Sequence, residues 1–145
     1  MRLSPARSEW RWPATALLVE IAAIHISLVP QHLREAPYAG ALFIALSAAA
    51  LMTAALLALC DDRRVWLSAS MLAGSAIVAY VASRWIGLPS LADDVGDWVN
   101  PLGIGAIVAE AITLALGFAV LFATKPRRRH ASRNVPVTPL ATGRA

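Results

Sequence analysis

Three ionisable side chains that could do chemistry lie inside long apolar stretches of the chain: Glu20, His25 and Glu110. A fourth, Arg84, lies close to the end of another such stretch. A charge at the centre of a bilayer costs about 2.5–3.5 kcal/mol on insertion scales, so residues of this kind usually face protein and have a partner. Together they could hold a ligand, a metal ion or a proton, or they could only fix how helices pack.

The depth of these residues favours a meeting of His25, Arg84 and Glu110. At a rise of 1.5 Å per residue, Glu110 lies about 13 Å from the start of its stretch and Arg84 about 7 Å from the end of its own. His25 lies about 6 Å from the end of its stretch, or about 12 Å if a helix continues through Pro30. We predict an outward-facing polar cluster of these three residues, which is either a ligand site or a structural contact.

A weaker pattern suggests a metal. His25 and His32 are seven residues apart, so they line one face if the helix passes through Pro30, and Glu35 continues that face. Such a strip suits zinc or copper. The spacing is too long for an HExxH site, and the alternative is a polar helix extension that faces water. The sequence leaves the cofactor, if any, unknown.

Glu20 is an intramembrane carboxylate that does not belong to this cluster. Five residues separate it from His25, which is about 140° around a helix, so the two do not share a face. We expect Glu20 nearer the cytoplasmic end, directed toward the inner interface or toward a partner such as Thr53.

Four apolar stretches must position these residues, and each is 17 to 24 residues long. About 20 residues cross a bilayer, so we predict transmembrane helices over about 13–29, 38–60, 65–88 and 101–124. Short connections favour an all-α, antiparallel, up-down-up-down bundle. The predicted organisation is a basic cytoplasmic N-terminus (1–12), a four-helix transmembrane domain (13–124) and a disordered basic cytoplasmic tail (125–145).

The basic residues predict the orientation. Of 13 Lys and Arg, 11 precede the first stretch, separate the second from the third, or follow the fourth, and only Arg34 and Arg84 lie near the other connections. Lys and Arg are retained on the cytoplasmic side, so both termini should be inside. A basic cytoplasmic rim also attracts anionic lipid, at about 1 kcal/mol per residue.

Aromatic residues mark the same boundaries. All five tryptophans fall at predicted membrane–water interfaces, where amphipathic rings are enriched. They are Trp10, Trp12, Trp66, Trp85 and Trp98.

Composition excludes several classes. The chain is 58% hydrophobic and 15% charged, against about a quarter charged in soluble domains. Its basic residues flank apolar stretches rather than line a soluble face, so nucleic-acid binding is not expected. Cys60 is the only cysteine, so no intramolecular disulfide forms. There is no Walker loop and no G-x-S-x-G elbow, and we do not expect an enzyme. The acidic loop residues Asp93, Asp94 and Asp97 are expected to be solvated.

Two segments carry a resemblance: residues 32–43, which read HLREAPYAGALF, and Ser83 to Pro89, which read SRWIGLP, with the later Glu110. They resemble a group of small four-helix integral membrane proteins of actinobacterial type. In that group a Trp often precedes the Pro that is Pro37 here, whereas this chain has Ala36. The resemblance implies a plasma-membrane protein and carries no activity.

Three functional hypotheses remain open. The first is an accessory or partner-binding module of the plasma membrane, acting as a homo-oligomer or within a larger membrane complex. The second is an outward-facing ligand or metal-binding module built on His25, Arg84 and Glu110. The third is a proton-coupled transporter or membrane enzyme in which Glu20 and Glu110 relay protons.

Overall fold

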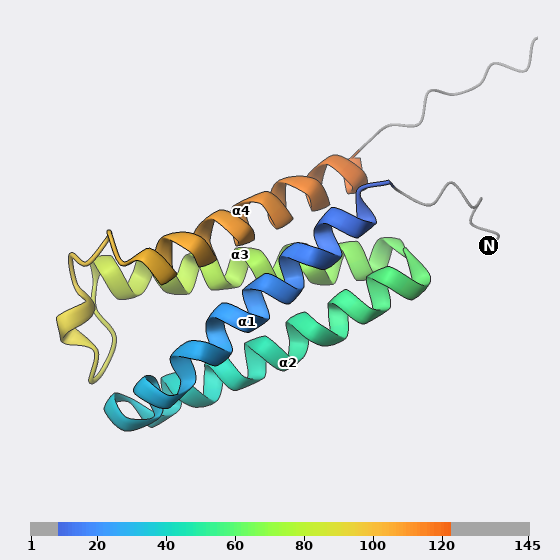
Figure 1. Ribbon diagram of the computed structural model, residues 1–145. Coiled ribbons are helices and arrows are strands. Elements are labelled where there is room, and N and C mark those ends of the chain that lie inside the picture. The colour runs from blue at the N-terminus through green and yellow to red at the C-terminus, as the bar shows by residue number, and fades with distance from the viewer. Residues whose placement is uncertain (1–8, 123–145) are drawn as a thin grey trace, which may run out of the picture.

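Four long helices make up most of the computed structural model, which describes residues 9–122 (Figure 1). They are α1 (Arg11–Glu35), α2 (Pro37–Cys60), α3 (Arg63–Trp85) and α4 (Pro101–Phe122), with a short 3-10 turn, η1 (Ala92–Asp94), between α3 and α4. Each of the four is long and apolar enough to cross a membrane. The predicted all-α chain with four helices of membrane-spanning length is confirmed.

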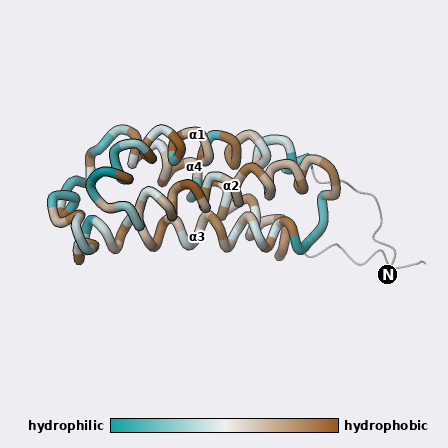
Figure 2. The backbone as a smooth tube through the Cα atoms, turned by 90° about the horizontal axis from the view of Figure 1, so that it is seen from below, coloured by the Kyte–Doolittle hydropathy of each residue, from teal (hydrophilic) through white to brown (hydrophobic). Residues whose placement is uncertain are grey.

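The helix ends gather at the two ends of the bundle (Figure 1). One end, which we call the loop end, holds the α1–α2 connection at Ala36 and the α3–α4 segment, residues 86–100. The opposite end holds the start of α1, the α2–α3 connection and the end of α4. Hydrophilic segments lie mostly at these two ends, and the length between them is mostly hydrophobic (Figure 2). This distribution is typical of a helical bundle that crosses a bilayer.

Local sequence signals explain where α3 and α4 begin. Asp62 precedes α3, and its side chain accepts a hydrogen bond of 2.7 Å from the backbone N–H of Arg64. Asn100 precedes α4, and its Oδ1 accepts from the N–H groups of Leu102 and Gly103 at 3.1 and 3.2 Å. These side chains satisfy N–H groups that have no partner inside the helix. The start of α4 at Asn100–Pro101 is as predicted.

The Asp62 N-cap is expected to contribute to the stability of the protein. Asp62→Ala should lower the free energy of unfolding by about 1 kcal/mol, since loss of an N-cap typically costs this much. The measurement is unfolding of the purified protein in detergent. Asp93→Ala, at an exposed position that begins no long helix, is the control and should leave stability unchanged.

The predicted end of the first helix at Val29 is wrong. The helix continues through Pro30 to Glu35, so a single residue, Ala36, separates it from α2. Proline disfavours helical geometry in the preceding residue. In a membrane-spanning helix, however, neighbouring helices and local adjustments tolerate the missing hydrogen bond. The continuation places His25 and His32 on one helix, as the longer of the two sequence alternatives requires.

Small residues bring the helices close together, as their frequency predicts. Gly103 lies against the ring of Tyr80, and a Cβ added there would come within 2.8 Å of it. A Cβ on Gly117 would collide with the Ser70 hydroxyl. In lipid, close packing of this kind replaces the hydrophobic effect as the force that associates helices.

Large apolar side chains cover the outside of the bundle. Leu59, Met52 and Val78 are 71%, 66% and 68% exposed, and many others are more than two-fifths exposed. Soluble monomers rarely expose an apolar surface of this extent. A surface of this kind is typical of helices that lie against lipid.

Four of the five tryptophans are exposed, and one is buried at the end of the bundle. Trp10, Trp12, Trp85 and Trp98 are exposed, whereas Trp66 is 1% exposed. The Trp66 indole N–H donates to the Asp61 carboxylate at 2.7 Å. This ring therefore belongs to the core at the α2–α3 end, with its polar edge directed to the connection.

Some predictions concern residues outside 9–122. They include most of the basic N-terminus, the predicted last residues of the fourth helix and the tail from 125 to 145.

Candidate functional site

A cavity of about 520 Å³ lies inside the half of the bundle nearest the loop end. Residues from all four helices and from the 86–100 segment line it. Its wall is mostly apolar, with a few polar groups directed into it. Those groups include His25, His32, Tyr80, Arg84, Asp94 and Glu110.

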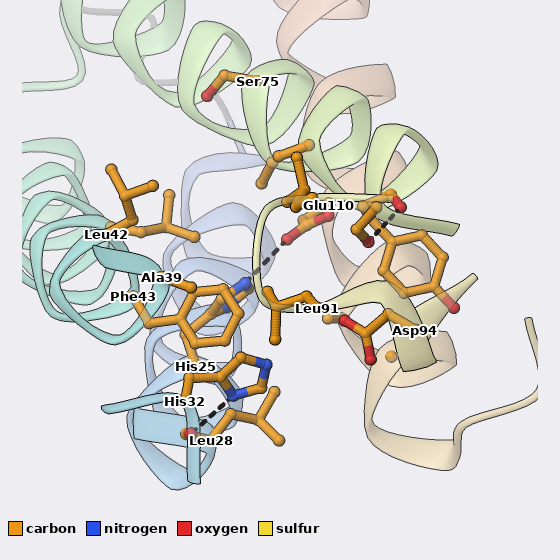
Figure 3. A pocket seen from close by; sticks show the side chains of 18 of the residues that line it. His25, Leu28, His32, Ala39, Leu42, Phe43, Ser75, Leu91, Asp94 and Glu110 are labelled. Atoms are coloured by element: carbon orange, nitrogen blue, oxygen red, sulfur yellow. Dashed lines mark hydrogen bonds and ion pairs between the residues drawn. The ribbon is translucent and has the colours of Figure 1, made fainter. Parts of the chain in front are cut away.

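His25 of α1 and Glu110 of α4 point toward each other in this cavity (Figure 3). The distance from His25 Nε2 to Glu110 Oε1 is 3.6 Å. Only 7% of His25 and 2% of Glu110 are exposed. The structure therefore brings together two of the three residues of the predicted cluster, on helices that sequence depth alone placed at similar levels.

One hydrogen bond of the His25 ring indicates its tautomer. Its Nδ1 lies 2.8 Å from the carbonyl oxygen of Ile21, and because a carbonyl only accepts, Nδ1 must carry a proton. Nε2 then faces Glu110 either as the acceptor nitrogen of a neutral imidazole or as a second N–H of an imidazolium. The pair has no net charge when a single proton resides either on Nε2 or on the carboxyl group. It can therefore hold one exchangeable proton without a net charge inside the membrane.

Arg84 lines the same cavity, but its partner is not Glu110. Its Nη1 lies 2.7 Å from Asp94 Oδ2, and its guanidinium carbon lies 5.0 Å from the centre of the Tyr80 ring. The expectation that Asp94 is only a solvated loop residue is therefore wrong. The spacing of apolar residues does not predict loop conformations. The one sequence signal for the Arg84–Asp94 ion pair is that an acidic loop follows Arg84 closely in the chain.

An aromatic wall is a further feature that sequence reasoning missed. The Phe43 ring centre lies 5.1 Å from that of His25 and 4.6 Å from that of His32. Phe43 comes from α2 and lies beside both histidines of α1 (Figure 3). The signal that could have found it is the alignment of α2 against an α1 that extends past Pro30.

The predicted metal strip of His25, His32 and Glu35 is not assembled as a ligand set. His32 Nδ1 bonds to the carbonyl of Leu28 at 2.9 Å, and the Glu35 carboxylate accepts from Gln31 at 3.0 Å. Within residues 9–122, no group of three His, Cys, Asp or Glu side chains is placed to hold a metal ion.

Glu20 lies away from this cavity. It is exposed on the outer surface of α1, whereas Thr53, the partner suggested by sequence, is buried. No hydrogen bond or ion pair joins Glu20 to another residue of the described part of the chain. The carboxyl group therefore faces the surroundings of the bundle rather than its core.

Comparison with known proteins assigns the chain to no family. The chain matches no protein-family model, no curated protein and no solved structure. The resemblance to small actinobacterial membrane proteins stays a prediction.

Proposed function

We propose that this chain is a small binding module of the cell membrane, with four antiparallel spans in up-down-up-down order and both termini in the cytoplasm. The placement of 11 of its 13 basic residues supports this orientation. The loop end then faces outward, and the cavity opens in the outer half of the membrane.

The single observation that carries a ligand-binding function is the cavity of about 520 Å³ beside the His25–Glu110 pair. If the pair served only to fix helix register, close packing around it would be expected, because protein interiors have few voids. Small-molecule sites have volumes of about 300–1,000 Å³, an apolar lining and a few convergent polar groups. The cavity has these properties, so we propose that it binds a small ligand, and we assign no reaction.

The test compares two variants in which an alanine of α4 is replaced by phenylalanine. Ala106 lines the cavity, and Ala111 is exposed and does not line it. Native mass spectrometry of protein extracted gently from its own membranes should find a bound small molecule. Ala106→Phe should remove it, and Ala111→Phe should retain it. Wild-type protein that carries nothing, and that binds no added small molecule, would contradict the proposal.

A second candidate, a partner-binding module that self-associates, is favoured by Glu20. Its neighbours along the same exposed face are Ala16, Ala23 and Ser27, which are spaced as in a helix–helix seam and are small enough for close approach. Glu20 lies about 13 Å along α1 from Arg11, so it faces the lipid interior. A carboxylic acid both donates and accepts, so two Glu20 side chains from two copies can satisfy each other across a two-fold axis.

This candidate predicts an effect of Glu20 on self-association. Single-molecule photobleaching in liposomes should show dimers of the wild-type protein. Glu20→Leu should lower the dimer fraction several-fold, and Glu20→Gln should retain it, because an amide also donates and accepts. Glu35→Leu is the control at the loop end. Monomers at every protein density would contradict self-association and leave the ligand proposal untouched.

A further inference from the structure

We infer that the ligand is a lipid-soluble molecule with an uncharged carbonyl head group, which enters the cavity from the membrane between α2 and α3. The inference rests on the proposed ligand-binding function and specifies its chemistry. Three observations support the inference. The first is the cover over the cavity at the loop end, the second is the side on which the cavity is open, and the third is a buried polar atom without a partner on a residue that lines the cavity.

The 86–100 segment covers the cavity at the loop end. Leu91 is buried at 7% exposure and packs in a cluster with Ala36 of the α1–α2 connection and Ala39 of α2. The Tyr38 hydroxyl donates to the Pro89 carbonyl at 2.7 Å, which fastens the segment to α2. The Arg84–Asp94 ion pair fastens it to α3. These contacts hold the segment over the cavity at the loop end.

The side of the cavity between α2 and α3 is open. Six of the residues that line the cavity are exposed. Gln31 and Tyr38 lie toward the loop end, and the other four belong to α2 and α3: Leu42, Ala45, Ser75 and Ala79. Leu42 belongs to α2 and Ser75 to α3, and Figure 3 shows both beside the cavity. Ala45 lies about 12 Å along α2 from Pro37, and Ser75 about 15 Å along α3 from Trp85. At that depth in a bilayer about 30 Å thick, the surroundings are acyl chains.

One donor of a residue that lines the cavity has no acceptor. The Arg84 Nε–H is buried and has no hydrogen-bond partner, although the Nη1 of the same side chain pairs with Asp94. Only 10% of the Arg84 side chain is exposed. A buried donor without an acceptor is unfavourable, so a ligand that supplies one acceptor oxygen fits this position.

The charges in the cavity favour an uncharged acceptor. Asp94 already balances the charge of Arg84 at 2.7 Å, and Glu110 lines the same cavity. A carboxylate or phosphate would add a further negative charge there, whereas a carbonyl oxygen accepts a hydrogen bond without one. The rings of Phe43 and His32 offer an aromatic wall for a flat head group, and the apolar side toward the lipid suits a hydrocarbon tail.

Three probes test the inference on wild-type protein in lipid nanodiscs, with empty nanodiscs subtracted. They are a benzoquinone with a ten-carbon tail, decanoate, and the same benzoquinone without a tail. Calorimetry should show saturable binding of the tailed quinone, at least tenfold tighter than binding of either other probe. Tighter binding of decanoate, or equal binding of the quinone without a tail, would overturn the inference. The ligand-binding proposal would survive either result, whereas failure of all probes together with no co-purifying ligand would remove both.

Variants test the two structural elements separately. Arg84→Lys keeps a cation for Asp94 but removes the Nε–H, and it should weaken binding of the tailed quinone by about tenfold or more. Ala45→Phe narrows the α2–α3 opening and should slow and weaken binding by a similar factor. Ala55→Phe, at an exposed α2 position outside the cavity, should change nothing. Unchanged affinity in both Arg84→Lys and Ala45→Phe would overturn the inference.

Discussion

Replacement of His25 by leucine should destabilise the bundle by about 1–3 kcal/mol. It leaves the Glu110 carboxyl group 2% exposed and without its nearest ionisable partner, and an unsatisfied buried polar group costs this much. Leucine fills a similar volume, so the loss of packing contributes little. The measurement is the free energy of unfolding of the purified protein in mixed detergent micelles.

The double variant separates the polar contact from packing. His25→Leu with Glu110→Leu should recover most of the loss, because replacement of a buried pair by apolar residues is often neutral or stabilising. The coupling between the two substitutions should be about 0.5–3 kcal/mol. His32→Leu is the matched control. His32 is half-buried, and it forms no ion pair with any residue in the range 9–122. Additive effects of the His25 and Glu110 changes would show that the two side chains do not interact.

Gly40→Ala should destabilise the protein by about 1–3 kcal/mol, the usual cost of overpacking. A Cβ on Gly40 would lie 2.8 Å from the backbone nitrogen of Leu33 and 2.6 Å from its Cγ. Because a backbone atom cannot swing away, α1 and α2 must separate where they carry His32 and Phe43. Thermal unfolding in detergent measures the effect.

Gly105→Ala is the control for this prediction. A Cβ there would lie 3.6 Å from the Ile24 side chain, which is an ordinary contact. Its melting temperature should stay at or above that of the wild type. Equal melting temperatures for the two variants would contradict the close approach of α1 and α2 at Gly40.

The helices were predictable from the sequence because their signals are physical and local. Apolar stretches of membrane-spanning length, the Asn100 cap and Pro101 are read directly from residue types. The meeting of His25 and Glu110 was predictable because the helical rise is fixed, so counting residues gives depth. The continuation of α1 through Pro30 was not predictable. The local preference against helical geometry before a proline is weaker than the helix packing that overrides it.

The rest of the site depends on contacts that no periodicity encodes. Arg84 was expected near Glu110, yet it pairs with Asp94, whose position follows from how the 86–100 segment folds over the loop end. Glu20 was expected to reach the cytoplasmic interface or a partner such as Thr53; it is exposed on the outer surface of α1, whereas Thr53 is buried. Hydropathy gives depth in the membrane but not rotation about a helix axis, because a helix that is apolar on all sides has no preferred face.

Cysteine labelling in intact cells tests the central claim most directly, namely that four spans turn the loop end and its cavity outward. Cys60 is the natural and only cysteine, and it is exposed at the opposite end. Asp93→Cys in a Cys60→Ser background places an exposed thiol at the loop end. A membrane-impermeant maleimide should label the position 93 thiol in intact cells and label Cys60 only after permeabilisation. Labelling of Cys60 in intact cells, with position 93 protected, would contradict the account.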